Sequence, residues 1–206
     1  MSIKEGKSTP ALRISHLAYG REKRGNRVVY LLEPKSHAGG KGVAEAVVLY
    51  RWRRRIYPNH RFSGARLGPN LWRAVGEVFG PDVSRWWRLS EEEVARRVEA
   101  GRAGLGVMGK SLPGSGVLWA LFQVCGPERL KRILVRHGEL QRAGRYGTPD
   151  LFLYAIDQGS NRPVLARFVE VKKPEEPSSK DQIEEIAFLK SIGLQARVLR
   201  LLERDG

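Results

Sequence analysis

Apolar positions in the C-terminal quarter of the chain change from strand spacing to helix spacing and back. Two runs rich in β-branched and aromatic residues, Leu151 to Ile156 and Leu165 to Val171, flank a cluster of turn-forming residues at 157–163. This pattern predicts a β-hairpin with a long loop. Gln182 to Ile192 then has helical spacing, and residues 195–202 indicate a returning strand. The predicted order is strand, strand, helix, strand.

The predicted helix carries its own start and stop signals. Ser178 and Ser179 precede Asp181 and Gln182 by three residues each, which is the spacing of a capping box. Gly193 follows the last turn, where glycine is a natural C-terminal stop.

Three charged residues stand at the open end of the predicted hairpin. Asp150 opens the first strand, and Glu170 and Lys172 end the second. Side chains alternate faces along a strand, so Glu170 and Lys172 point the same way and strand pairing can bring Asp150 beside them. Two neighbouring carboxylates repel each other, and an oxygen-preferring cation such as Mg²⁺ is the usual resolution. The pattern is typical of a metal-dependent phosphodiesterase, in which Lys172 stabilises developing charge.

A simpler interpretation exists for each part of this pattern. A Pro-Asp step is a common turn opener, and Glu-x-Lys on a strand is often a solvated surface pair. The combination favours the catalytic interpretation, because both elements lie on apolar strands, in order, and a helix start follows at once.

Taken together, these motifs resemble those of a known nuclease family. Gly-x-Pro-Asp-Leu at 147–151, Phe-Val-Glu-Val-Lys at 168–172 and Gln182 at a helix start resemble the VRR-NUC nucleases of the PD-(D/E)xK superfamily, over about Gly116 to Leu202. The resemblance implies an α/β fold with a restriction-endonuclease-like core, an α-β-β-β-α-β mixed sheet flanked by helices, and a helical insert. One departure is Lys-Pro-Glu-Glu-Pro at 173–177, where relatives often have Gly-Pro.

The resemblance also implies roles for individual residues. Asp150 and Glu170 would bind Mg²⁺ or Mn²⁺, and the backbone carbonyl of Val171 would be a further ligand. Lys172 would be the catalytic lysine, and Gln182 would support the site from the following helix.

The family places one more glutamate, from an upstream helix, at the site, and Glu45 is the first candidate. Residues 43–56 predict a helix on which Glu45 shares a face with apolar positions 48, 49, 52 and 56. A carboxylate in an apolar stripe needs a buried partner, but a negative charge near a helix N-terminus is favourable in itself. Both interpretations stay open, and Glu77 and Glu139 are weaker candidates.

Charge changes the picture of the partner. Lys+Arg number 37 against 22 Asp+Glu, giving a formal net charge of +15 and a pI of about 10.4, which favours a nucleic acid. The densest basic stretch surrounds Trp52. The predicted DNA-binding residues are Arg51, Arg53, Arg54, Arg55 and Lys173. The alternative is that the arginines form a solvated helix face; Trp52 is expected in the core.

At 206 residues the chain is long enough for one domain with a sizeable core. We expect a basic N-terminal segment at 1–42 and a single nuclease domain at 43–206 with a helical insert at about 58–116. Within the insert, Ser90 before three acidic residues predicts a helix start, and the glycine-rich stretch 101–116 predicts a loop.

Several classes of protein are disfavoured. The single Cys125 excludes an intrachain disulfide and a cysteine-based zinc site, and we expect it in the core. No glycine pattern indicates a nucleotide cofactor, and no apolar run is long enough for a membrane span. Met1 to Arg13 lacks a signal core, so a cytoplasmic location, nucleoid-associated or viral, is expected. His137 is a further candidate near the site.

The leading expectation is a Mg²⁺- or Mn²⁺-dependent endonuclease acting on branched DNA, either a flap or a four-way junction. A homodimer is possible, because stand-alone members of the resembling family cut junctions as dimers. A non-catalytic nucleic-acid-binding protein and a sequence-specific restriction-type nuclease of the same superfamily are the alternatives.

Overall fold

The computed structural model describes residues 14–24, 27–32, 36–39, 43–145 and 147–203, the first three ranges by their backbone alone. The strands are β1 (Ile14–Arg24), β2 (Arg27–Leu32), β3 (Ser36–Gly39), β4 (His60–Arg66), β5 (Leu151–Asp157), β6 (Arg162–Lys172) and β7 (Ala196–Glu203). The helices are α1 (Val43–Arg53), α2 (Leu71–Phe79), α3 (Glu91–Gly104), α4 (Ser115–Arg142) and α5 (Lys180–Ser191), with the 3₁₀ segments η1 (Val83–Arg88) and η2 (Gly106–Ser111).

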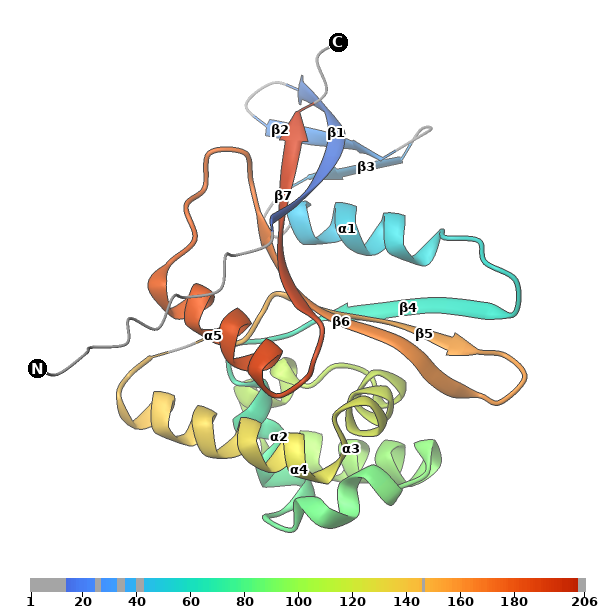
Figure 1. Ribbon diagram of the computed structural model, residues 1–206, viewed down its shortest axis with the longest axis vertical. Helices are drawn as coiled ribbons and strands as arrows, with labels where there is room; N and C mark the ends of the chain where they lie inside the picture. Colours follow the sequence, from blue (N-terminus) through green and yellow to red (C-terminus); the bar gives the residue numbers. More distant parts are fainter. Residues whose placement is uncertain (1–13, 25–26, 33–35, 40–42, 146, 204–206) are drawn as a thin grey trace, which may run out of the picture.

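The strands form one mixed sheet with the order β3-β2-β1-β7-β6-β5-β4. Strands β4, β5 and β6 are antiparallel neighbours, whereas β7 runs parallel to both β6 and β1. Read along the chain, α1-β4-β5-β6-α5-β7 is the expected α-β-β-β-α-β core, with helices inserted between β4 and β5 (Figure 1). The predicted fold class is therefore confirmed.

Helices cover both faces of the central strands. On one face α1 lies over the sheet, and on the other the helices α2 to α5 gather (Figure 1). Alternate residues of β5 enter the two clusters: Leu151 and Leu153 pack on the α1 side, and Phe152 and Tyr154 pack on the other. Because both faces of β5 are covered, its sequence is continuously apolar instead of alternating.

Trp52 joins α1 to the sheet, as expected of a core residue. Its side chain is 3% exposed, and its indole Nε1 donates hydrogen bonds to the carbonyl oxygens of Ser63 (2.8 Å) and Tyr154 (3.1 Å). The predicted helix end at residue 56 is wrong, because α1 stops at Arg53 and Ile56 is 98% exposed. Residues that precede a proline avoid the helical conformation, and Pro58 follows closely.

The hairpin is tighter than predicted. The strands continue to Asp157 and from Arg162, so the expected long loop is wrong. Asp157 Oδ1 accepts hydrogen bonds from the backbone N–H (2.7 Å) and the hydroxyl (2.8 Å) of Ser160. Asn161 adopts a positive φ of 51°, which asparagine tolerates better than most residues. These local bonds close the turn and let the strands pair further than the apolar run alone suggests.

The insert also differs from the prediction. Residues 60–66, expected as part of a helical insert at about 58–116, form β4, and the first inserted helix begins at Leu71. The predicted loop at 101–116 is wrong, because α3 continues to Gly104 and η2 follows. A Cβ on Gly109 would lie 2.9 Å from the carbonyl oxygen of Arg102. Glycine is needed there for close packing.

Two predictions about the helices between β4 and β5 are confirmed. Ser90 caps α3, accepting a hydrogen bond from the backbone N–H of Glu93 (3.2 Å). Cys125 lies in the core, where burial raises the pKa of its thiol to about 12.

Within the described residues no helix is both long and apolar enough to cross a membrane. The division at 42/43 stays a prediction, and 1–13, 25–26, 33–35 and 40–42 lie outside the described residues.

Two glycines with different surroundings test this packing. A Cβ at Gly64 of β4 would lie 2.8 Å from the Phe152 carbonyl oxygen and 2.9 Å from Leu153 Cδ2, whereas nothing lies within 4 Å of one at Gly76 of α2. We expect Gly64→Ala to lower the free energy of unfolding by about 1–3 kcal/mol. Gly76→Ala should raise it by about 0.5–1 kcal/mol. Urea unfolding measures both, and equal effects would contradict the packing.

Candidate active site

The pairing of β5 with β6 brings the motif carboxylates together. Leu151 pairs with Val169, so one step further the antiparallel register sets Asp150 opposite Glu170. Asp150 Oδ2 accepts a hydrogen bond from the backbone N–H of Val171 (2.8 Å). The carbonyl oxygen of Asp150 accepts another from the N–H of Leu67 (2.8 Å). Asp150 is therefore fixed at the end of β5 by its backbone and by its side chain.

Glu170 and Lys172 point to the same side of β6, as their spacing predicts, and both are buried, at 3% and 2% exposure. Lys172 Nζ lies 3.2 Å from Glu170 Oε1 and 3.1 Å from Glu176 Oε1. The simpler interpretation of Glu-x-Lys as a solvated surface pair is thus wrong, because both side chains are shielded from solvent.

Gln182 joins helix α5 to this cluster. The predicted capping box is present, with Ser179 as the cap: Ser179 N–H donates to Gln182 Oε1 (2.9 Å), and Gln182 N–H donates to the Ser179 hydroxyl (3.3 Å). The amide nitrogen Nε2 of the same Gln182 donates to Glu170 Oε1. The second predicted cap pair is not formed, because Asp181 instead accepts hydrogen bonds from Arg145.

Burial and a neighbouring negative charge raise the pKa of both carboxyls. Burial, and then the negative charge of Asp150, raise the pKa of Glu170 to about 7 against the opposing pull of Lys172. The pKa of Asp150 is also raised, by burial and by the charge of Glu45, although the Val171 N–H opposes the shift. Burial alone would lower the pKa of Lys172, but its bonds and charge interactions with Glu176 and Glu170 outweigh burial and raise it.

Glu45 lies in the first turn of α1, close enough to Asp150 for its charge to act on that carboxyl. Its Oε2 pairs with Arg66 Nη2 at 3.2 Å, and its side chain is 25% exposed. The arginine is on β4 and its side chain is 46% exposed, so it is not the buried partner that the apolar stripe would require. The weaker candidates, Glu77 and Glu139, are exposed on α2 and α4. The role of Glu45 as a metal ligand stays a prediction.

The donor set suits a hard divalent cation. A raised pKa on two adjacent carboxyls marks a site that lacks positive charge, which a cation supplies. In a strand the N–H and C=O of one residue face the same neighbour. Val171 gives its N–H to Asp150, so its carbonyl faces the same side. Across the described residues no three His, Cys, Asp or Glu side chains converge as a preformed cage. Mg²⁺ commonly uses one or two carboxylates, with waters and phosphates as its other ligands.

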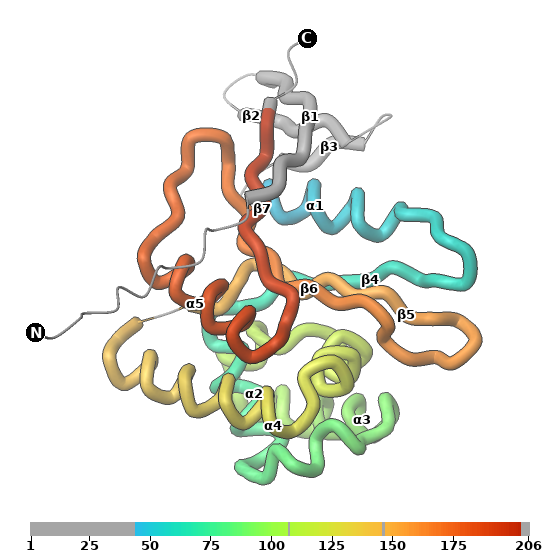
Figure 2. Tube along the Cα trace, viewed as in Figure 1, coloured from blue at the N-terminus to red at the C-terminus, as the bar shows by residue number. Residues whose placement is uncertain are grey.

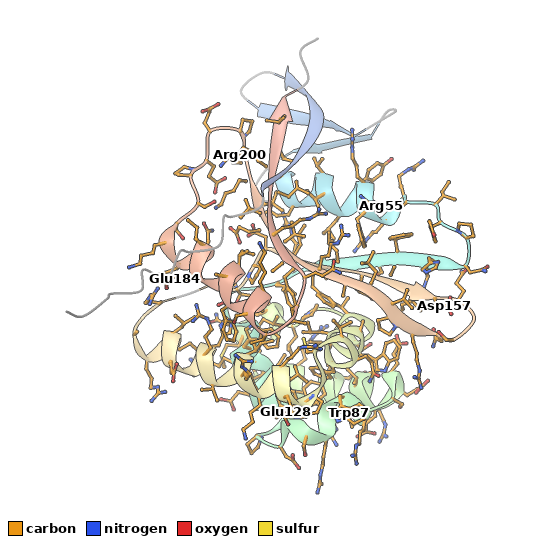
Figure 3. The ribbon with its side chains drawn as sticks, viewed as in Figure 1. Arg55, Trp87, Glu128, Asp157, Glu184 and Arg200 are labelled. Carbon is orange, nitrogen blue, oxygen red and sulfur yellow. The ribbon has the colours of Figure 1, made fainter. Side chains whose placement is uncertain are left out.

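The predicted DNA-binding arginines lie at the other end of α1 from Glu45, as Arg55 shows (Figure 3). Arg53 Nη2 donates to the carbonyl oxygen of Gly64 (2.6 Å), and the guanidinium groups of Arg54 and Arg55 lie over the rings of Tyr50 and Trp52. The side chains at 53–55 are exposed, that at 51 is half-buried, and Lys173 is exposed just beyond the site. Their contacts with DNA stay predictions.

Two groups of residues near the site were missed by the sequence analysis. Glu176 contacts Lys172, which lies only four residues earlier in the chain. The acidic residues of the Lys-Pro-Glu-Glu-Pro segment, so close to Lys172, were a signal that could have predicted this contact. Glu185 of α5 is buried and accepts hydrogen bonds from Arg136 Nε (2.8 Å) and His137 Nε2 (3.1 Å) of α4. His137 is thus bonded to Glu185 and makes no described contact with the motif carboxylates. No local signal predicts this pair, since 48 residues separate them.

Comparison with known proteins agrees with the motif. Residues 108–201 match the family model of the VRR-NUC domain, which confirms the resemblance. A crystal structure of paFAN1 bound to DNA with a 2-nucleotide 5′ flap and a gap has a TM-score of 0.54 at 17% identity, covering 98% of this chain and 40% of that one. Another, with a 1-nucleotide 5′ flap, has a TM-score of 0.44 at 16% identity, covering 97% and 39%. The chain thus spans about two fifths of paFAN1, and the first likeness shows a shared fold. No curated protein matches the chain.

The raised pKa of Glu170 predicts a pH dependence of stability. The folded protein holds this proton up to about pH 7, whereas the unfolded chain releases it near 4.5. Unfolded chains therefore bind fewer protons between these values, and the unfolding free energy falls as pH rises through that window. Glu170→Gln cannot ionise there, so in EDTA it should gain stability relative to wild type from pH 4.5 to 7 and hold that gain above.

Urea unfolding across this window checks the prediction. Glu175→Gln, at an exposed position, is the control for net charge and should follow wild type. A difference between wild type and Glu170→Gln that does not change with pH would contradict the raised pKa.

Proposed function

Since residues 108–201 match the VRR-NUC domain, we propose that this protein is a divalent-metal-dependent endonuclease that hydrolyses phosphodiester bonds in branched DNA. The observation that carries the proposal is the cluster of Asp150, Glu170, Lys172 and Gln182, of which Glu170 and Lys172 are buried and the other two half-buried. In it two adjacent carboxyls with raised pKa values meet one ammonium. Burying these charges lowers the stability of the fold, and a role in phosphodiester hydrolysis accounts for their presence.

Each residue of the cluster has a role in the proposed reaction. Asp150, Glu170 and the carbonyl of Val171 would hold Mg²⁺ or Mn²⁺, with Glu45 as the candidate from α1. The cation would polarise the phosphate and make a bound water more acidic. Lys172 would direct its ammonium at the phosphate and stabilise the negative charge that develops there. Gln182 would keep Glu170 oriented through its amide.

The DNA contacts would follow charge and shape. A net charge of +15 favours the phosphate backbone, which fixes position without reading sequence. The structure of paFAN1 holds a 5′-flap DNA, so a flap comes first among the proposed substrates and a four-way junction second. We further propose an intracellular location and, if junctions are the substrate, a homodimer. A binding protein without activity and a restriction-type nuclease are the alternatives that the following assay separates.

We expect the purified protein to cut branched DNA in Mg²⁺ or Mn²⁺ and to be inactive in EDTA. Labelled linear, 5′-flap, splayed-arm and four-way-junction DNA are the substrates. Asp150→Ala should lose cleavage, because the cation loses a ligand. Lys172→Ala should lower the rate about 10²–10³-fold, the cost of removing one group that stabilises transition-state charge.

Each outcome of this assay identifies one of the proposed functions. Cutting at defined positions of linear duplex would favour the restriction-type nuclease. Tight binding without metal-dependent cutting of any substrate would leave a binding protein. Glu99→Ala, an exposed change on α3, is the control and should cut like wild type.

The arginines at the end of α1 make a separate prediction. Arg54 is exposed, and among the described residues its guanidinium overlies Tyr50 and forms no ion pair, so its charge is available to a phosphate. Arg54→Gln should weaken DNA binding about equally for all sequences and reduce the slope of log Kd against log salt by about 1. Titration over a range of salt concentrations measures this. Arg73→Gln, exposed on α2, changes net charge equally and should keep the wild-type slope; equal slopes for both variants would remove Arg54 from the interface.

A further inference from the structure

A carboxylate outside the nuclease motif contacts the motif lysine. Glu176 Oε1 lies 3.1 Å from Lys172 Nζ, as close as Glu170 Oε1 at 3.2 Å. The other oxygen, Glu176 Oε2, accepts a hydrogen bond from the backbone N–H of Lys173 (3.4 Å). Glu176 therefore bridges the ammonium of Lys172 and the backbone that follows it.

One arginine of β7 holds the segment that carries Glu176. Arg200 Nη1 donates to the carbonyl oxygens of Lys173 (2.9 Å), Pro174 and Glu176 (2.9 Å). In the β6–β7 register Arg200 pairs with Lys172, so the two side chains come from neighbouring positions on adjacent strands. The segment rises as an arc between β6 and α5 (Figure 2), with Arg200 between β7 and the arc (Figure 3). Three carbonyl contacts to one side chain make this a fixed support.

The support matters most when Glu170 is engaged elsewhere. Glu170 Oε1 already accepts a hydrogen bond from Gln182, and Glu170 is a proposed ligand of the cation. A carboxylate bound to a divalent cation has less negative charge to offer an ammonium. Lysine is a point charge on a flexible four-carbon stem, so Lys172 needs another partner to keep its place. Glu176 does not belong to the proposed ligand set and stays available.

We propose that Glu176 is a positioning residue for Lys172, and that Arg200 anchors the segment that presents it. This inference rests on the proposed nuclease function. Glu176 acts through Lys172 and touches neither the phosphate nor the cation. Its effect should therefore appear in the rate of the bound complex and not in the affinity for DNA.

Steady-state cleavage of 5′-flap DNA in Mg²⁺ tests this role. Glu176→Ala should lower kcat about 10–100-fold, the usual cost of losing a partner that orients a site residue, with KM changed little. Glu176→Gln should fall between Ala and wild type, because its amide oxygen still accepts from Nζ. Arg200→Gln should also lower kcat, because the segment that presents Glu176 loses its anchor. Thermal unfolding of each variant shows that it remains folded.

Glu175→Ala is the matched control. Glu175 lies on the same segment and is exposed, and its side chain makes no hydrogen bond or ion pair within the described part of the chain. It changes net charge as Glu176→Ala does and should retain the wild-type kcat. Equal kcat values for the two variants, or an effect of Glu176→Ala on KM alone, would overturn the proposal.

A second measurement does not depend on cleavage. Side-chain ¹⁵N NMR of lysine, recorded in Mg²⁺ and without DNA so that the cation engages Glu170, detects ammonium groups that are buried and hydrogen-bonded. The Lys172 signal is identified by its loss in Lys172→Arg. The signal should persist in Glu175→Ala and disappear in Glu176→Ala. If wild type cuts no DNA but the signal depends on Glu176, the nuclease function fails and the positioning contact stands. A signal that is unchanged in Glu176→Ala overturns the positioning role.

Discussion

The hydrogen-bonded ladder between β5 and β6 is the constraint on which the candidate site depends. It sets Asp150 opposite Glu170, a pairing that burial and like charge oppose. The strands can bear that cost because apolar residues cover both faces of β5 and pack against α1 on one side and the helical layer on the other. Strand β5 ends at the pair of Leu151 with Val169, and beyond it the Val171 N–H donates to the Asp150 carboxylate. The unfavourable pair of Asp150 and Glu170 is thus held together by the β5–β6 ladder and by the packing of the two strands.

Helix α5 adds a second constraint through its first turn. In most helices a capping box only satisfies free backbone N–H groups. Here the Gln182 side chain caps Ser179 with its oxygen and orients Glu170 with its nitrogen. The start of α5 and the orientation of the Glu170 carboxylate therefore depend on the same side chain, and a shift of α5 would disturb both. The buried Glu185, three residues further along α5 and bonded to Arg136 and His137 of α4, resists such a shift.

The insert and the segment after β6 place the remaining parts. Helices α2 to α4 complete the core under β5 and β6, so the insert stabilises the strands that carry the motif. Arg200 fixes the arc that brings Glu176 to Lys172. Lys172 is therefore enclosed by two carboxylates from one short stretch of chain. A buried ammonium of this kind is pre-organised, which is what stabilisation of transition-state charge requires.

The sequence by itself determined what local spacing controls. The period of two put Glu170 and Lys172 on one face, the Ser-x-x-Gln spacing set the start of α5, and the apolar runs located the hairpin and the helix and strand that follow it. Its errors were also local: the turn at 157–161 is closed by Ser160 and Asp157, and within the predicted loop at 101–116 Gly101 and Gly109 serve close packing. Local patterns report backbone preference, which packing overrides where a small residue is needed for contact.

Only the tertiary structure decided which side chains meet across long separations. The pairing of Glu45 with Arg66, the bond between Glu185 and His137, and the hold of Arg200 on the segment at Lys173 join positions 21 to 48 residues apart. No periodicity encodes these contacts, because each depends on how β4, β7 and α4 dock onto the sheet. The chemistry of the motif could be read from residue types, but its burial, its raised pKa values and its supporting partners arise from packing.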